Sequence, residues 1–143
     1  MKALAGCRLG VSRTPARVLA IVLLPIASAA ASKAEQAAFA VVKDFYEAAN
    51  RKQCEAAANF MTEDSLVQQT LAGQGGFEAF CRDRGGRAAL QGIFLVKAEV
   101  KKTVATVLAE RQYKDGSSSR ELEHLVNVDG TWKLTLPSKA AAP

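Results

Sequence analysis

Two Asp-Gly pairs near the C-terminal end constrain the fold of this chain more than any other feature. The pairs are Asp115-Gly116 and Asp129-Gly130, and each separates two runs in which apolar and polar residues alternate. An Asp-Gly pair in that setting is a strong signal for a β-hairpin, because type I′ turns need positive φ at both central residues. We therefore predict antiparallel strands joined by tight turns over residues 90–136.

The alternation predicts four strands, at 92–101, 104–113, 119–128 and 132–136. In the last strand Trp132, Leu134 and Leu136 share one face, as a sheet with one buried face requires. Phe94 in the first strand and His124 in the third are in phase with apolar neighbours. We therefore expect both side chains to point to the concave, buried side of the sheet.

Helical periodicity precedes the strands. Ser32 and Glu35 fit a capping box, and the apolar residues that follow have helical spacing, which predicts a helix over 33–50. A short link leads to a second predicted helix at 53–61, so the two must form an antiparallel hairpin. Residues 66–70 favour a short strand, and 77–84 favour a third short helix. The predicted class is α+β, with the helical hairpin and the third short helix packed on a curved antiparallel sheet of about four strands.

The N-terminal stretch has the layout of a secretory signal peptide. Residues 1–31 contain basic but no acidic residues, an apolar run at 18–26 and a small-residue ending. We expect cleavage after Ala29 or Ala31. The run is short for a membrane span, which needs about 20 residues, so an uncleaved anchor is a weaker alternative. A mitochondrial presequence is weaker still, because it would be amphipathic, whereas this run is apolar on every side. The prediction is an exported chain, periplasmic or secreted, with one domain at 32–137 and a disordered tail at 138–143.

The basic balance of the full chain belongs mostly to that signal. The sequence has 19 Lys and Arg against 14 Asp and Glu, a net charge of +5. Removing residues 1–31 leaves 15 basic and 14 acidic residues, a net charge of +1. A charge so close to zero does not support nucleic acid as a partner. We expect contact with a membrane only through the export signal.

Cys54 and Cys81 are the two cysteines left after cleavage, since Cys7 leaves with the signal. An even number of cysteines in an exported chain favours a disulfide. This disulfide would close a loop of roughly 28 residues and contribute about 3–4 kcal/mol. Two inert thiols or a redox pair are the alternatives. Two Cys and one His are a poor ligand set for zinc, so we expect no metal and no cofactor.

The predicted order of elements and three sequence stretches carry a resemblance to a known superfamily. The stretches are Val41–Ala48, Tyr113–Gly116 and Leu125–Leu134. With them the chain resembles the NTF2-like superfamily of cystatin-like α+β cones. Within it, the chain is most similar to the exported bacterial domains grouped as DUF4878, which are related to lumazine-binding-like proteins. The resemblance covers most of residues 35–136 and rests on structural motifs, so it specifies the fold better than the function.

The resemblance implies a cone with a pocket between the sheet and the helices. Its lining would include Phe45, Tyr46, Phe94, His124 and Trp132. The first hypothesis is a non-enzymatic exported module. Such a module binds a small apolar ligand in the cone, or a partner protein through its sheet, with a second copy of the chain as one candidate partner. An open cone and a cone filled by its own side chains are both compatible with the sequence.

The second hypothesis is a small pocket enzyme of isomerase or hydrolase type. His124 is the only histidine, so histidine-based catalysis would use it, with Tyr46 or Tyr113 as its partner. A buried structural histidine gives the same pattern, and no catalytic motif accompanies it. We therefore assign no catalytic residue, and His124 stays a candidate.

Charged residues near the third predicted helix have two interpretations. Arg82, Arg84 and Arg87 cluster at its end. They favour a solvated helix terminus whose cations complement the helix dipole, with an anion site as the alternative. On the third strand, we expect Glu123 to be exposed.

Overall fold

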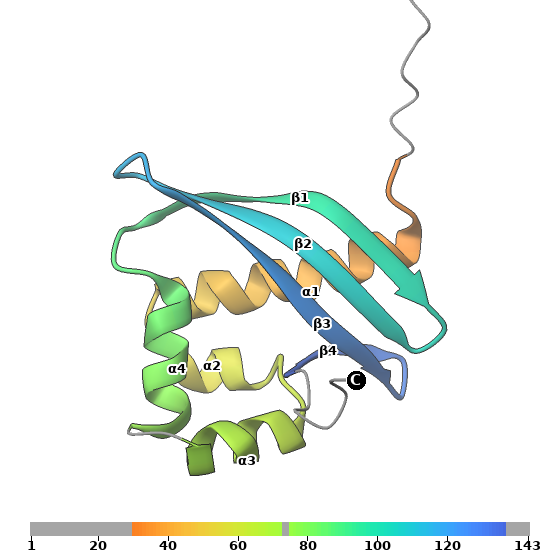
Figure 1. Ribbon diagram of the computed structural model, residues 1–143, viewed down its shortest axis with the longest axis horizontal. Coiled ribbons are helices and arrows are strands. Elements are labelled where there is room, and N and C mark those ends of the chain that lie inside the picture. The colour runs from red at the N-terminus through yellow and green to blue at the C-terminus, as the bar shows by residue number, and fades with distance from the viewer. Residues whose placement is uncertain (1–29, 73–74, 137–143) are drawn as a thin grey trace, which may run out of the picture.

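The computed structural model describes residues 30–72 and 75–136. The predicted tail and nearly all of the predicted signal peptide therefore lie outside the described residues. Within them, four helices precede a four-stranded antiparallel sheet (Figure 1), which confirms the predicted α+β class. In chain order the elements are α1 (Lys33–Asn50), α2 (Cys54–Ala58), α3 (Glu63–Ala72), α4 (Gly76–Gly85), β1 (Leu90–Lys101), β2 (Val104–Tyr113), β3 (Ser118–Val128) and β4 (Thr131–Thr135).

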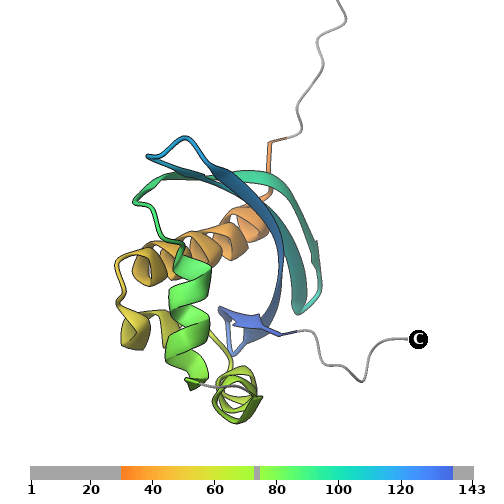
Figure 2. The ribbon, with the colours of Figure 1, turned by 60° about the vertical axis from the view of Figure 1, so that its left-hand side comes forward.

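The sheet bends around α1. Its strand order is β1-β2-β3-β4, and α1 lies along the concave side (Figure 2). We call the side that faces α1 the inner face and the convex side the outer face. Beyond β4, Met61 adds a short parallel bridge to Leu134. None of the helices within residues 30–72 and 75–136 combines the length and the apolar character needed to cross a bilayer.

The start and end of α1 are fixed by side chains. Ser32 Oγ accepts a hydrogen bond from the amide of Glu35 at 3.2 Å, and a carboxylate oxygen of Glu35 accepts one from the Ser32 amide at 2.9 Å. This reciprocal pair satisfies two donors that a helix start leaves free, and it confirms the predicted helix over 33–50. At the other end, the Asn50 side-chain amide donates to the carbonyl groups of Gly85 and Ala88.

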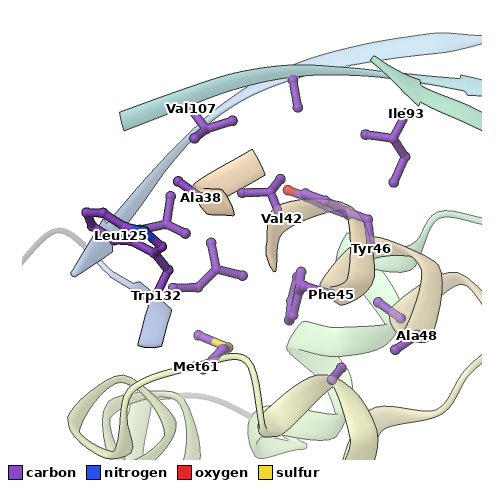
Figure 3. Packing of buried hydrophobic residues seen from close by; sticks show 14 of the residues in the cluster. Ala38, Val42, Phe45, Tyr46, Ala48, Met61, Ile93, Val107, Leu125 and Trp132 are labelled. Carbon is purple, nitrogen blue, oxygen red and sulfur yellow. The ribbon is translucent and has the colours of Figure 1, made fainter. Parts of the chain in front are cut away.

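The core lies between α1 and the inner face of the sheet. Val42, Phe45 and Tyr46 of α1 are at most 2% exposed. Figure 3 shows them between the sheet strands and the segment that carries Met61. Trp132 and Leu134 of β4 close the core at its far side, as the alternation in the last strand predicts.

Cys54 and Cys81 form a disulfide, with a Cα–Cα distance of 5.8 Å. The pairing predicted from the sequence is therefore confirmed. The bond links α2 to α4, two short helices that both pack against α1. Cys81 is fully buried in the core, so the disulfide fixes α4 at the place where its apolar side meets α1.

The strand predicted at 66–70 is wrong, because these residues belong to α3. Thr62 explains the helix. Its side-chain oxygen accepts a hydrogen bond from the amide of Ser65 at 3.3 Å, as an N-cap residue does. The acidic residues Glu63 and Asp64 then occupy the first turn, where the helix dipole favours negative charge. Thr62 and the three residues after it therefore form the start of α3.

The predicted faces of two strands are also wrong. In β1 a register shift between Leu95 and Lys97 changes the phase of the alternation, so Phe94 lies on the outer face and is 51% exposed. In β3 His124 lies opposite Thr106 and alternates with the buried Leu125, which places His124 on the outer face too. In β3 the period of two is correct, but the alternation does not say which face is buried.

The two Asp-Gly turns differ from each other. Asp129 and Gly130 have φ of 52° and 86°, the two positive values that the predicted type I′ turn needs. At the other turn only Gly116 has positive φ, at 86°. There the Asp115 carboxylate accepts a hydrogen bond from the Ser117 amide, which fits a three-residue loop that ends in a left-handed glycine.

Candidate functional site

The inner face carries charged residues at one end of the core. Alternation along β2 and β3 directs Arg111, Glu121 and Glu123 inward, beside the buried apolar residues of the same strands. Arg84 at the end of α4 and Tyr46 of α1 meet them there. We call these five residues the inner charge cluster.

Each member of the cluster has partners on other elements. The Tyr46 hydroxyl donates a hydrogen bond to Glu123. Arg84 Nη1 lies 2.5 Å from Glu121 Oε1 and 3.2 Å from Glu123 Oε1. Arg111 Nη2 lies 2.7 Å from Glu121 Oε2, and its guanidinium carbon lies 4.2 Å from the centre of the Tyr46 ring. With both carboxylates ionised, the two arginines neutralise them.

Burial changes the proton affinity of two groups in the cluster. Burial, followed by the charge of Glu123, raises the pKa of the Tyr46 hydroxyl far above its ordinary value. Burial also raises the pKa of Glu123, although the Tyr46 hydroxyl and Arg84 act in the opposite direction. Tyr46 is therefore a neutral hydrogen-bond donor at any physiological pH, and Glu123 ionises at some cost in stability.

Of the three comparisons with known proteins, only the one with solved structures gives a match. A scan against protein-family models finds no match, and a search of curated proteins finds none. Among solved structures, the chain is similar to a Campylobacter jejuni protein described as an NTF2-like transpeptidase. The TM-score is 0.53 and the identity 11%, over 74% of this chain and all of that one. The chain has the NTF2-like fold. At this identity the likeness carries the fold and no activity, and the closer likeness to DUF4878 domains stays a prediction.

The five side chains predicted to line the pocket of the cone do not surround one cavity. Phe45, Tyr46 and Trp132 are at most 8% exposed and pack in a single core cluster. Phe94 and His124 lie on the other face of the sheet. The three inward residues therefore fill the space between sheet and helices at the positions where the sequence predicts a lining.

His124 does not meet either tyrosine. It lines a groove of about 760 Å³ at the end of the sheet, together with Val104, Thr106 and Leu136. Tyr46 points inward to Glu123, and Tyr113 packs against Gly86. Because the sheet separates His124 from both hydroxyl groups, the pairing that a pocket enzyme would need is absent from the described part of the chain.

Three of the five residues in the inner charge cluster, Arg111, Glu121 and Glu123, are not predicted as site residues from the sequence, whereas Tyr46 and Arg84 are candidates there. The sequence predicts an exposed Glu123, which is wrong, because its side chain is only 14% exposed. Arg84 is the one member of the basic helix end that turns inward, while Arg82 and Arg87 stay exposed. The available signal is the spacing of Glu121 and Glu123, which places two carboxylates on one face of β3. Within residues 30–72 and 75–136 they form no metal-ligand group with His or Cys.

The outer face has a contrasting composition. Phe94, Val96 and Leu122 are 51%, 43% and 53% exposed. Leu108 lies directly opposite Leu122 and one step diagonally from Phe94, because Phe94 pairs with Glu110. These four apolar residues lie near one another on the outer face of β1, β2 and β3, with Lys97 directly opposite Leu108. We call these four residues the outer patch.

Proposed function

We propose that this chain is an exported, non-enzymatic module that binds a partner protein through the outer face of its sheet. The observation that carries the proposal is the outer patch, in which Phe94 and Val96 of β1 and Leu122 of β3 are about half-exposed on one face of the sheet. Exposed apolar side chains that are grouped rather than scattered mark interaction surfaces. In the part of the chain that the structure describes, no helix lies along the convex side of β1–β3 (Figure 2).

The surroundings of the outer patch support the same proposal. On one side Arg120 pairs with Glu110 at 2.6 Å, and on the other Lys101 pairs with Glu99 at 2.8 Å. An apolar centre with a polar, charged rim is the usual anatomy of a protein interface. Because both signs of charge are present in pairs, this rim does not favour a strongly charged partner such as nucleic acid.

Export is the part of the proposal that rests on the N-terminal sequence. A basic start, an apolar core and a small-residue ending favour secretion. The Cys54–Cys81 disulfide supports it, because such bonds persist in oxidising compartments. The structure gives less support to a ligand inside the cone, since Phe45, Tyr46 and Trp132 occupy that space.

Photo-cross-linking in an exporting host tests the proposal. A photoreactive residue at position 122, in the outer patch, is compared with one at position 44 on the exposed side of α1. We expect a discrete protein adduct from position 122 and none from position 44. The mass of the adduct distinguishes a second copy of the chain from another protein, and Phe94→Ser should abolish it. Equal labelling from both positions, or none from position 122, would overturn the proposal.

A further inference from the structure

We propose that Arg84 and Arg111 form a binding site for a small oxyanion, a carboxylate or a phosphate, which Glu121 occupies as an internal ligand. The site lies on the inner face, so it is independent of the role proposed for the outer patch. In this arrangement the Glu121 side chain closes a two-arginine anion site until a free oxyanion displaces it.

The contacts of Glu121 are those of an oxyanion held between two arginines. One carboxylate oxygen lies 2.5 Å from Arg84 Nη1, and the other lies 2.7 Å from Arg111 Nη2. The Tyr46 hydroxyl is 3.4 Å from the second oxygen. Charge-assisted hydrogen bonds from guanidinium groups are the strongest that proteins direct at carboxylates and phosphates. A free oxyanion in this position would meet the same two guanidinium groups.

Arg111 is built into the structure as a fixed donor. The residue is only 5% exposed, and its Nη1 donates to the Arg84 carbonyl oxygen at 2.6 Å. Its guanidinium also stacks over the Tyr46 ring and donates to Ser119 Oγ at 3.1 Å. Arg111 Nε has no hydrogen-bond partner among the described residues. A buried donor without a partner is uncommon.

The two carboxylates of the cluster are not equivalent. The Glu123 side chain is 14% exposed and receives the Tyr46 hydroxyl hydrogen bond. The Glu121 side chain is 35% exposed, so its carboxylate can rotate into solvent without unfolding the sheet. When it does, two arginines face one remaining carboxylate, and the resulting net positive charge favours an incoming anion.

The Glu121→Ala variant tests the site directly, because the substitution removes the atoms that acetate can replace. Acetate and inorganic phosphate are titrated at constant ionic strength, with chloride as the reference salt, and binding is followed by the thermal unfolding midpoint. We expect the variant to bind acetate about tenfold more tightly than the wild type, since the internal competitor is gone. Glu110→Ala, which removes an ion-paired carboxylate on the outer face, should behave as the wild type.

A second variant and a second measurement keep the proposal open to refutation. Adding Arg84→Met to Glu121→Ala should abolish the acetate response. In the wild type, phosphate should shift the NMR signals of the Arg84 and Arg111 side chains saturably, while those of Arg120 stay constant. The proposal is overturned by a folded Glu121→Ala variant that binds acetate no better than the wild type. It is also overturned if the wild-type arginine signals do not saturate.

Discussion

At the scale of single residues, the inner charge cluster is the unusual feature of this molecule. A buried ionic group seldom adds net stability, because desolvation offsets the attraction between the charges. Here Tyr46 and Glu123 are held together by three elements that are distant in sequence. Single substitutions that leave the rest of the cluster in place can therefore measure how much Tyr46 and Glu123 contribute to the free energy of unfolding.

Replacing Glu123 by Gln should change how stability depends on pH. Burial raises the pKa of Glu123 in the folded state above its ordinary value. The stability contributed by this carboxyl group is therefore complete below that ordinary value and is lost as the pH rises through the folded-state pKa. Urea unfolding between pH 4 and pH 8 should show the free energy of the wild type falling relative to Glu123→Gln as pH increases.

Glu110→Gln is the matched control for that measurement. Hydrogen bonds from Gln112 and Arg120 lower the pKa of Glu110. The stability contributed by the Glu110 carboxylate is therefore present at high pH and is lost as the pH falls. The difference between wild type and this variant should therefore grow as pH rises. Parallel curves for wild type and Glu123→Gln would contradict the account.

Tyr46→Phe should destabilise the fold by about 1–3 kcal/mol, because Glu123 loses a buried hydrogen-bond donor while the ring packing is kept. Urea unfolding at neutral pH measures the change. Tyr113→Phe serves as the comparison, because the described part of the chain gives the Tyr113 hydroxyl no hydrogen-bond partner. Equal effects of the two substitutions would show that the Tyr46 hydroxyl has no special role.

The sequence does not predict the hydrogen bond between Tyr46 and Glu123, and the reason is physical. Alternation shows that Glu121 and Glu123 share a face with Leu125, but a carboxylate ordinarily indicates the solvent side of a strand. Only Arg84 and Arg111, which come from α4 and β2, make the buried position tolerable. That compensation depends on the three-dimensional arrangement of elements, which residue spacing does not reveal.

At the scale of elements, local signals determine which predictions hold. α1 begins at a capping box whose two hydrogen bonds involve residues three apart, so nearby sequence is enough to predict it. α3 was missed because its cap, Thr62, is not followed by a strongly apolar face, and short apolar runs do not distinguish strand from helix. In β1 a register shift between Leu95 and Lys97 puts Phe94 on the face opposite to the one predicted, and a regular alternation cannot anticipate such a shift.

The disulfide should be the main support of α4. It joins Cys54 to Cys81, which are 27 positions apart in the sequence, and a loop of that length corresponds to about 3–4 kcal/mol in the free energy of unfolding. We expect dithiothreitol to lower the urea midpoint of the wild type accordingly. The double variant Cys54→Ala/Cys81→Ala should be insensitive to the reductant, and a wild-type midpoint that does not change on reduction would contradict this assignment.

At the scale of the whole molecule, the sheet separates two surfaces with different properties. The inner face packs against α1 and leaves the predicted lining residues Phe45, Tyr46 and Trp132 inside the core. The outer face presents Phe94 and Leu122 to solvent. The fold class could be predicted from turns, caps and alternation, but the choice between a ligand-binding cone and an association surface depends on which face is filled.

Native mass spectrometry of the chain from an exporting host, without reductant, tests the central claim most directly. We predict a chain two hydrogens lighter than its reduced mass, free of small-molecule adducts and assembled with a second protein chain. The double variant Phe94→Ser/Leu122→Ser should be monomeric and still folded, because exposed positions tolerate such changes. A monomeric wild type that carries a small-molecule adduct would contradict the account, since it would place function in the cone instead of on the outer face.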